Sequence, residues 1–424
     1  MFYSLIGCMI GQMGTSSRIY LDNASATPID PRVAKAIYHA LEELPGNPSA
    51  PSHEGRKAYE ALTLAREKIA RSFSVKTDEL LFVSGGTEAN NIAIQGLIEA
   101  LHQRSAAYTD LHIVTTSIEH SSVLKTLAIL EAKGVSVTYV PPDFDGLVRA
   151  EAIVSALRKE TALVTIAHVN SEVGTIQPLS DIYIELKRWK SRKLTTLTSF
   201  APETSFPVFH VDAAQSPLYL DAGPHVFGAD MVSYDAQKVQ GPKGIGVLYR
   251  NFSVPLAPLW GGGTQERGIR PGTENVAGIV GASIAFELAK EGREAREKRV
   301  RELRDYMISL VREKIPEAEL LGHPKRRIAN NALFTVEGAD GDYLSVLMDE
   351  RGVAVAPRSA CVGTGTSVSH VALELTHEES KARGTIRFSL GVFTNQFEVE
   401  RAVRIFKEVV AVAKSGLSLK KQST

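Results

Sequence analysis

The stretch Leu80-Leu81-Phe82-Val83-Ser84-Gly85-Gly86-Thr87-Glu88-Ala89-Asn90-Asn91 (residues 80–91) joins a short apolar run to two glycines and the polar start of a helix. Four apolar residues followed by a glycine turn are typical of a strand buried on both faces. Small residues at such a turn let backbone N–H groups approach an anion, and the helix N-terminus adds partial positive charge. The stretch therefore predicts a strand–turn–helix unit and a candidate phosphate site, although similar glycines also form turns that bind nothing.

Short apolar runs alternate with helical patterns from about residue 52 to residue 250. A seventh run, residues 244–249, follows a Gly-Pro turn and predicts an antiparallel strand. Because strands that alternate with helices form a sheet covered on both faces, the predicted fold class is α/β with a mostly parallel seven-stranded sheet. The six runs that fit its other strands are 80–83, 112–115, 135–140, 162–167, 208–211 and 231–234.

The chain is expected to contain a large domain and a smaller one. A long, heavily charged helical stretch from about residue 275 to residue 315 leads into a smaller set of strands and helices. Residues 191–206, rich in Ser and Thr, predict a surface insertion. The predicted parts are a loose N-terminal extension with Met13 as an alternative start (1–18), a large domain (28–272), a small domain (19–27 with 273–414) and a disordered tail (415–424).

Composition limits what the protein is expected to bind. Lys plus Arg and Asp plus Glu each number 48 among the 424 residues, so no excess charge attracts nucleic acid or a membrane surface. Two cysteines, Cys8 and Cys361, are too few for a disulfide framework and favour a reducing compartment such as the cytoplasm. No histidine pair has metal-ligand spacing. These features predict a small-molecule substrate, no metal, and thiol chemistry at a single cysteine.

Two further apolar runs end in ionisable side chains. One ends at Asp212 and is followed by Gln215, and the other ends just before Lys238 and a glycine-rich turn. At the open edge of an α/β sheet, Asp212 suits a protonated pyridine nitrogen, or equally a helix cap or a salt bridge. A partly desolvated Lys238 would form a Schiff base, but a surface lysine is the commoner case. Taken alone, His120 and His168 fit core or capping histidines.

In combination and in this order, the motifs resemble the group I cysteine desulfurases of nitrogen fixation and iron–sulfur cluster assembly, within the class V aminotransferase superfamily. The resemblance extends from residue 20 almost to the C-terminus, and it implies the fold type I architecture of aminotransferases that use pyridoxal 5'-phosphate. The segments that carry it are 20–24, 46–49, 86–87, 118–120, 168–175, 241–246, 270–275, 358–361 and 386–391.

The resemblance implies a role for each residue of a cofactor site in the large domain. Lys238 would hold pyridoxal 5'-phosphate as an internal aldimine, with Asp212 on the pyridine nitrogen, Gln215 on the ring hydroxyl and His120 stacked on the ring as a catalytic residue. The remaining contacts would come from Gly86 and Thr87 at the phosphate, Thr273 of a neighbouring subunit there as well, Asn170 in the pocket wall, and Asn23 and Arg387 at the substrate carboxylate.

The resemblance also implies a reaction and its partners. The Cys361 thiolate would take the sulfur of L-cysteine, leaving L-alanine and a persulfide on the enzyme. The glycine-rich and serine-rich stretch after Cys361 suits a loop that carries sulfur to an acceptor protein. A homodimer is expected, while cluster assembly, transfer RNA thiolation and thio-cofactor synthesis all stay open as the destination of the sulfur.

Two residues beside the lysine depart from the family pattern. Serine and histidine usually stand three and one residues before the lysine, near the phosphate, where this chain has Asp235 and Gln237. A carboxylate about 4 Å from a phosphate is repelled by a few kcal/mol at an effective dielectric constant of about 20. Asp235 is therefore expected to point away, to be neutralised, or to weaken cofactor retention, and Asp235→Ser to tighten cofactor binding.

Two alternative functions remain open at the level of sequence. The first is another class V enzyme with the same cofactor, such as a selenocysteine lyase or an aminotransferase, in which Cys361 is incidental. The second is a degenerate scaffold for sulfur transfer that has lost catalysis. Loss of sulfide release in Cys361→Ala with the cofactor still bound would argue against the first. The presence of Lys238, Asp212, His120, Cys361 and Arg387 together argues against the second, while Asp235 and Gln237 leave it open.

Overall fold

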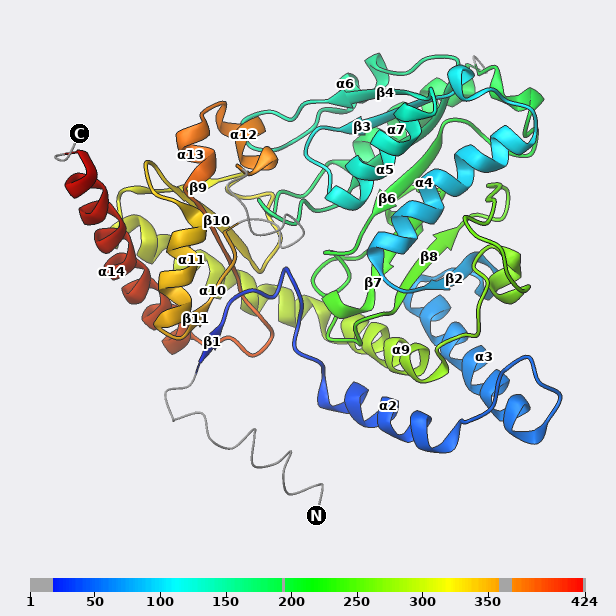
Figure 1. The fold of residues 1–424 in the computed structure, drawn as a ribbon, viewed down its shortest axis with the longest axis horizontal. Coiled ribbons are helices and arrows are strands. Elements are labelled where there is room, and N and C mark those ends of the chain that lie inside the picture. Colours follow the sequence, from blue (N-terminus) through cyan, green and yellow to red (C-terminus); the bar gives the residue numbers. More distant parts are fainter. Residues whose placement is uncertain (1–17, 193–194, 358–367, 422–424) are drawn as a thin grey trace.

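The computed structural model describes residues 18–192, 195–357 and 368–421, arranged as a large unit and a smaller one side by side (Figure 1). In the large unit a seven-stranded sheet has the strand order β2-β8-β7-β6-β5-β3-β4. β8 pairs antiparallel with both β2 and β7, and all other pairs are parallel. The strands are β2 (Leu80–Val83), β3 (His112–Thr116), β4 (Ser136–Val140), β5 (Thr161–Ala167), β6 (Val208–Asp212), β7 (Met231–Asp235) and β8 (Gly246–Arg250).

The sheet is confirmed as predicted, and its strands alternate their side chains between two apolar layers. Leu163 and Val208 pack in one cluster, while their neighbours Val164 and Phe209 pack in another. This alternation follows from the two-residue period of a strand. The first cluster lies under α4 (Gly86–Gln103) and α5 (Ser121–Ala132), and the second lies under α3 (His53–Phe73), α7 (Leu179–Ser191) and α9 (Val276–Lys290).

The smaller unit has its own three-stranded antiparallel sheet, ordered β12-β10-β9. Its strands are β9 (Ala318–Leu321), β10 (Asn331–Val336) and β12 (Thr385–Ser389). A parallel pair, β1 (Ile19–Tyr20) with β11 (Val353–Ala354), brings the first described residues against this unit. Its helices are α10 (Arg293–Lys314), α11 (Gly341–Glu350), α12 (His370–Thr376), α13 (Glu379–Arg383) and α14 (Gln396–Lys421).

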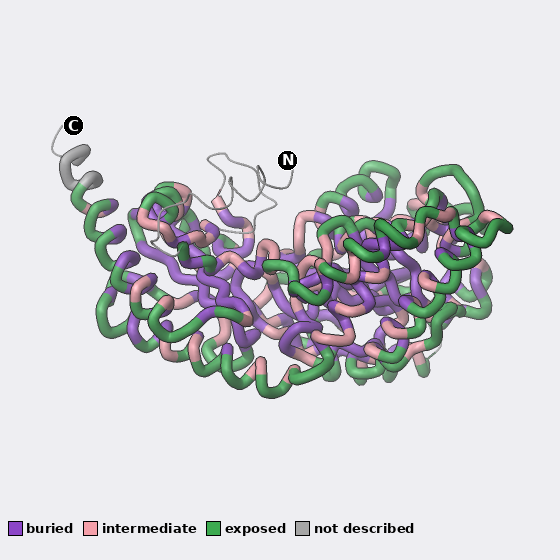
Figure 2. Tube along the Cα trace, turned by 90° about the horizontal axis from the view of Figure 1, so that it is seen from below, coloured by how far each residue is buried: buried purple, intermediate pink, exposed green. Residues whose placement is uncertain are grey.

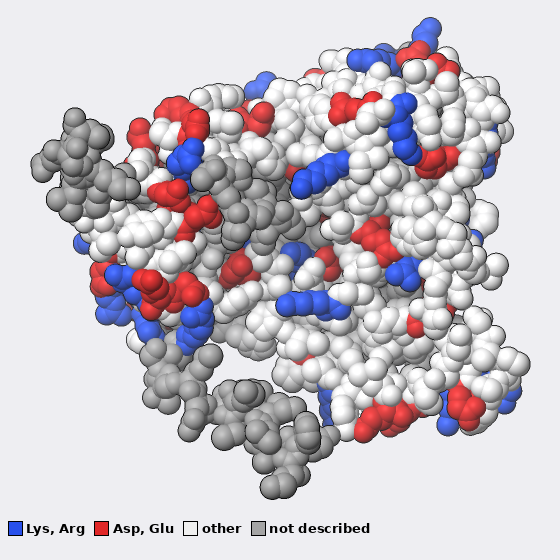
Figure 3. All heavy atoms as spheres, in the orientation of Figure 1, with Lys and Arg blue, Asp and Glu red and all other residues white. Residues whose placement is uncertain are grey.

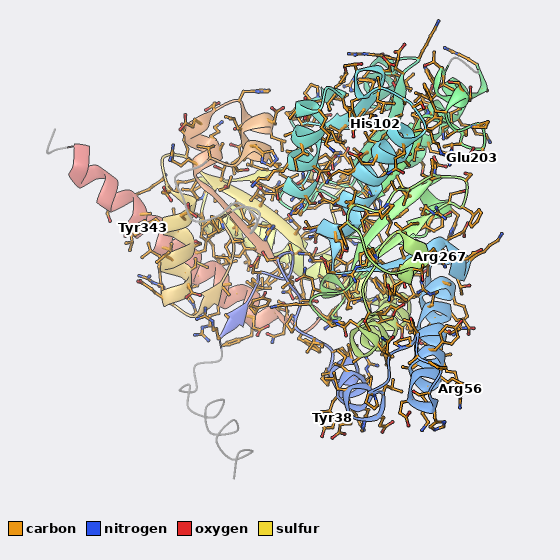
Figure 4. All side chains as sticks on the ribbon, turned by 45° about the vertical axis from the view of Figure 1, so that its right-hand side comes forward. Tyr38, Arg56, His102, Glu203, Arg267 and Tyr343 are labelled. Atoms are coloured by element: carbon orange, nitrogen blue, oxygen red, sulfur yellow. The ribbon has the colours of Figure 1, made fainter. Side chains whose placement is uncertain are left out.

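Three further helices complete the described α-helices. They are α2 (Pro31–Glu43), α6 (Ala150–Ser155) and α8 (Pro224–Phe227). Tyr38 on α2 and Arg56 on α3 are exposed at the outer edge of the large unit (Figure 4). Buried residues form the interior of both units (Figure 2). Acidic and basic side chains are interspersed on the face seen in Figure 3, in keeping with the balanced composition.

Two sequence predictions need correction, and a third is refined. The stretch predicted to be helical is helical, but Gly292 at φ 61° divides it into α9 and α10, and α9 packs largely buried against α2 and α3. Residues 191–206 are more than a surface insertion, since Leu197, Ala201 and Phe206 are buried in the core beside α4. The polar composition of the segment concealed these apolar anchors.

The tail was also predicted wrongly. Helix α14 continues to Lys421, past the expected start of a disordered tail at residue 415. Its earlier turns are anchored by Val409, Val410 and Ala413 in the core, and extending an anchored helix costs little because nucleation has already occurred. None of the helices in the described ranges combines the length and apolar character needed to cross a bilayer.

Candidate active site

A cavity of about 270 Å³ lies where the parallel strands end and α4 begins. Asp212 and Asp235 are the last residues of β6 and β7, and Gly86 is the first residue of α4. Ligands of open α/β sheets bind at this edge, because the carboxyl ends of the strands and the helix N-termini meet there. The predicted cofactor residues that line the cavity are Gly86, Thr87, His120, Asn170, Asp212, Gln215, Asp235, Gln237 and Lys238.

Lys238 ends a short 3₁₀ turn, Ala236–Lys238, directly after β7. Its Nζ donates to the backbone carbonyls of Ala24 at 2.8 Å and Ser25 at 2.5 Å. Gln215 reaches the same segment, since its Nε2 donates to the Ala24 carbonyl at 3.0 Å. The segment after β1 thus holds the lysine amine and the glutamine amide at the wall of the cavity.

Asp212 presents a buried carboxylate to the cavity and is 9% exposed. Its Oδ2 accepts from Asn90 Nδ2 at 2.7 Å, and its Oδ1 accepts from the backbone N–H of Ala214 at 3.0 Å. Both donors are neutral, and no basic side chain in the described ranges forms an ion pair with Asp212. A buried carboxylate held in this way is suited to a cation that enters the cavity.

His120 stands at the start of α5 and lines the cavity. Its Nδ1 accepts from the backbone N–H of Ser122 at 3.1 Å and lies 2.7 Å from Ser122 Oγ. Ser122 Oγ in turn accepts from Asn90 Nδ2 at 2.9 Å. With Nδ1 used as an acceptor, the proton of a neutral ring sits on Nε2. His120 is thus both a capping histidine and part of a chain that reaches Asp212 through Asn90.

Arg387 on β12 is 1% exposed and brings positive charge from the smaller unit to the cavity. Its Nη1 donates to the Ser171 carbonyl at 2.7 Å, and its Nη2 donates to Asp22 Oδ1 at 2.9 Å and Ser25 Oγ at 2.8 Å. Its Nε is buried and has no hydrogen-bond acceptor among the described residues. One donor of the guanidinium is therefore available to an anionic ligand.

Two predicted site residues do not line the cavity. Asn23 is buried, and its Nδ2 donates to the backbone carbonyls of Ser389 at 2.9 Å and Tyr20 at 3.3 Å. Thr273 is exposed in the loop before α9. The structure therefore places Asn23 as a support behind Arg387 rather than beside a ligand, because its amide is used to hold β12. Cys361, like Cys8, lies outside the described residues.

The sequence left open that Asp235 points away from the start of α4, but the structure shows that it points toward it. Its Oδ2 accepts from the backbone N–H of Gly86 at 3.3 Å and from Gln237 Nε2 at 2.9 Å. Its Oδ1 accepts from the backbone N–H of Gln237 at 3.2 Å. The carboxylate is 6% exposed and lines the cavity at the end where a phosphate was expected.

The cavity fits pyridoxal 5'-phosphate on three observations. A primary amine, a carboxylate without a cationic partner in the described ranges, and a helix N-terminus share one cavity. A Cβ atom on Gly86 would lie 3.4 Å from Asp235 Oδ2, so the glycine keeps the helix end open. Asn90 Oδ1 and Arg387 Nε are both buried in the cavity wall without partners among the described residues. Unmet polar atoms of this kind are expected where a ligand binds.

Glu119 lies behind the cavity and is fully buried. Burial raises the pKa of this carboxyl to about 7, and the nearby Asp212 charge adds to the effect. Thr116 Oγ1 donates to Glu119 Oε1 at 2.6 Å, and the Ala167 N–H donates to Oε2 at 3.0 Å. Glu119 therefore changes charge near neutral pH just beneath the cavity floor.

His168 is a core histidine and does not line the cavity. Its Nδ1 lies 2.8 Å from Ser216 Oγ, and its ring centroid lies 4.6 Å from that of Phe227. Burial lowers its pKa to about 4, so the ring is neutral at physiological pH.

Asp22 and Asn90 belong to motifs of the sequence that indicate no role for either residue, and nothing in the sequence points to Ser122. Asn90 is four residues after Gly86, so the two share one face of α4, and that spacing was the available signal. Asp22 had no comparable signal, because its partner Arg387 is 365 residues away. Within the described ranges no cluster of three His, Cys, Asp or Glu side chains could hold a metal ion.

Comparisons with known proteins agree with this geometry. Residues 19–402 match the family model described as aminotransferase class V. A cysteine desulfurase IscS of Dictyoglomus turgidum is 37% identical over 392 residues, which cover 92% of this chain and 94% of the relative. A solved structure titled NifS-like protein has a TM-score of 0.82 at 32% identity, covering 93% of this chain and all of the other. The structure titled SspA in complex with cysteine has a TM-score of 0.72 at 32% identity, covering 89% of this chain and all of the other.

Proposed function

The chain belongs to the class V aminotransferase family and is a cysteine desulfurase that uses pyridoxal 5'-phosphate, and we propose that Lys238 holds this cofactor while Cys361 receives the sulfur. One observation carries the assignment of the site: Lys238, Asp212 and the N-terminus of α4 line a single cavity. The relatives named as cysteine desulfurases support the reaction, and the structure titled as a complex with cysteine supports L-cysteine as the substrate.

Lys238 and Asp212 would act on different parts of the cofactor. When bound, the cofactor supplies an electron sink. This sink makes the Cα proton of L-cysteine acidic and weakens the carbon–sulfur bond of the same substrate. Lys238 Nζ would form the covalent attachment and, when released, take and return the Cα proton. Asp212, held by Asn90 and the Ala214 N–H, would keep the pyridine nitrogen protonated.

The remaining wall residues would orient the cofactor and the substrate. His120 faces the cavity from α5 and would pack on the ring, while Gln215 and Asn170 would contact its polar groups. Gly86 and Thr87 would hold the phosphate with the N–H groups of α4. Arg387 would bind the substrate carboxylate through its unmet Nε, with Asp22 and Ser25 fixing the plane of the guanidinium.

Sulfur transfer would take place at the Cys361 thiolate. As the thiolate attacks the substrate sulfur, a sulfur–sulfur bond forms and the carbon–sulfur bond breaks, leaving its electron pair on the substrate carbon. Protons taken up at carbon then give L-alanine. The persulfide on Cys361 would pass to an acceptor protein, with iron–sulfur cluster assembly as one destination.

We further propose that the protein is a homodimer located in the cytoplasm. Thr273 is exposed and outside its own cavity, which supports its use in the phosphate site of a second subunit in a homodimer. The large domain over 28–272 and the small domain over 19–27 with 273–414 stay predictions, although α9 packs against α2 and α3. A cytoplasmic location is supported by the presence of only two cysteines.

The two cysteines allow a matched test. After mixing with L-cysteine and dithiothreitol, the thiol that reduces a persulfide to sulfide, Cys8→Ala should release alanine and sulfide like the unaltered enzyme. Cys361→Ala should keep the cofactor, measured by absorbance, but lose sulfide release. Full sulfide release by Cys361→Ala would contradict its assignment as sulfur acceptor and favour another reaction of the family.

A further inference from the structure

The Asp235 carboxylate occupies the N-terminus of α4, where a phosphate would otherwise bind. Asp235 Oδ2 accepts from the Gly86 N–H at 3.3 Å, and two further donors from Gln237 hold the same carboxylate. Asp235 is 6% exposed, and no Lys, Arg or His within the described ranges forms an ion pair with it. Its negative charge is therefore stabilised by amide groups and by the helix N-terminus.

Helix α4 has few other means of satisfying its first turn. Its N-cap residue is Gly85, which offers no side chain to accept from the free N–H groups. The first N–H groups of a helix need acceptors and attract negative charge. Asp235, which arrives from the end of β7, supplies that acceptor from a different element of the sheet.

A phosphate placed at the same N–H groups would meet the Asp235 carboxylate. Glu88 in the first turn of α4 adds a second acidic side chain, but Arg270 pairs with it at 3.0 Å. The charge of Asp235 has no such compensation in the described ranges. Bringing a phosphate to this end of the cavity thus requires the carboxylate to move, to take up a proton, or to be repelled.

We propose that Asp235 is an internal competitor of the cofactor phosphate, with Gln237 as the positioning residue that holds it there. The inference depends on the proposed function, since it concerns the same cofactor. Its consequence is a site that gains little affinity from the phosphate group and discriminates weakly between pyridoxal 5'-phosphate and pyridoxal.

The ratio of two dissociation constants isolates this effect. Pyridoxal carries the same ring and aldehyde as the cofactor but no phosphate, so both can react with Lys238. Equilibrium dialysis of the cofactor-free full-length chain against each compound gives the two constants. Asp235→Asn keeps the size and the acceptor oxygen of the side chain while removing its charge. Asp340→Asn is the matched control, because Asp340 caps α11 by accepting from the Tyr343 N–H at 3.1 Å and does not line the cavity.

We expect the unaltered chain to prefer the phosphorylated compound by only about tenfold, and Asp235→Asn to raise that preference by about a hundredfold or more, as expected for removal of one like charge at about 4 Å and an effective dielectric constant of about 20. Asp340→Asn should leave the ratio unchanged. An unchanged ratio in Asp235→Asn, with both compounds bound, would overturn the inference and leave the proposed function standing.

If Asp235→Asn does not fold, the ratio of the two dissociation constants in the unaltered chain still tests the inference. A preference of about a thousandfold or more in that chain would overturn the inference, because two hydrogen bonds from N–H groups to a charged phosphate, with no opposing carboxylate, give a preference of about that order. If neither compound binds to any of the folded chains, the proposed function fails and this inference fails with it.

Discussion

Asn90 Nδ2 donates to Asp212 Oδ2 at 2.7 Å and so ties the second turn of α4 to the end of β6. The same amide group donates to Ser122 Oγ at 2.9 Å, which is in contact with His120. Gly86, one turn earlier on α4, lines the same cavity. A single helix thus positions the phosphate end, the ring carboxylate and the capping histidine relative to one another.

Replacing Asn90 should therefore weaken cofactor binding. Asn90→Ala removes one of the two donors that hold Asp212 and leaves its carboxylate less well oriented. We expect the dissociation constant of the cofactor to rise by about tenfold, the value of one hydrogen bond to a charged group. The neighbouring Asn91→Ala is the control, since Asn91 bonds to Thr87, Gln95 and Thr126 but not to Asp212. Equal effects of the two substitutions would argue against the proposed role of Asn90.

Arg387→Lys tests recognition of the substrate carboxylate. Lysine keeps the positive charge beside Asp22 but lacks the planar set of donors, including the free Nε. We expect KM for L-cysteine to rise by about tenfold or more while the cofactor stays bound. Arg383→Lys, on the exposed helix α13 where Arg383 pairs with Glu379, should leave KM unchanged. An unchanged KM in Arg387→Lys would show that the carboxylate binds elsewhere.

His168 should make the free energy of unfolding depend on pH. Burial lowers the pKa of this imidazole to about 4 from 6.5, so the unfolded chain binds a proton that the folded chain does not between these values. The stability contributed by the neutral ring is present above pH 6.5 and is lost as pH falls to about 4, by on the order of 3 kcal/mol. Urea unfolding at several pH values should show a shallower decline in His168→Gln than in the unaltered chain. Parallel declines would contradict the neutral, buried ring, because every other titrating group is common to both proteins.

Much of the fold could be predicted from the sequence, because buried strands leave a local signal. All seven strands of the large sheet lie within two residues of the predicted bounds, and β8 is antiparallel as its Gly-Pro turn indicated. The failures came from tertiary packing. The apolar residues of 191–206 are too few to show in composition, and only their burial in the same core cluster as Leu101 and Leu111 reveals them.

The candidate site was predictable where a residue ends a strand or begins a helix. Gly86, Asp212 and Lys238 all stand at such ends, and topology brings them together. Contacts between distant segments were not predictable, since nothing local in the sequence joins Arg387 to Asp22 or Asp235 to Gly86. Sequence therefore predicted which residues line the cavity better than it predicted what each one contacts.

The central claim is that Lys238 holds pyridoxal 5'-phosphate and that the loaded protein removes sulfur from L-cysteine. The measurement is the absorbance spectrum of the cofactor-loaded chain, with alanine and sulfide assayed after L-cysteine and dithiothreitol are added. We expect a band near roughly 400 nm from the link between cofactor and lysine, with alanine and sulfide formed in the unaltered chain and neither the band nor the products in Lys238→Ala. The same band and products in Lys238→Ala would contradict it.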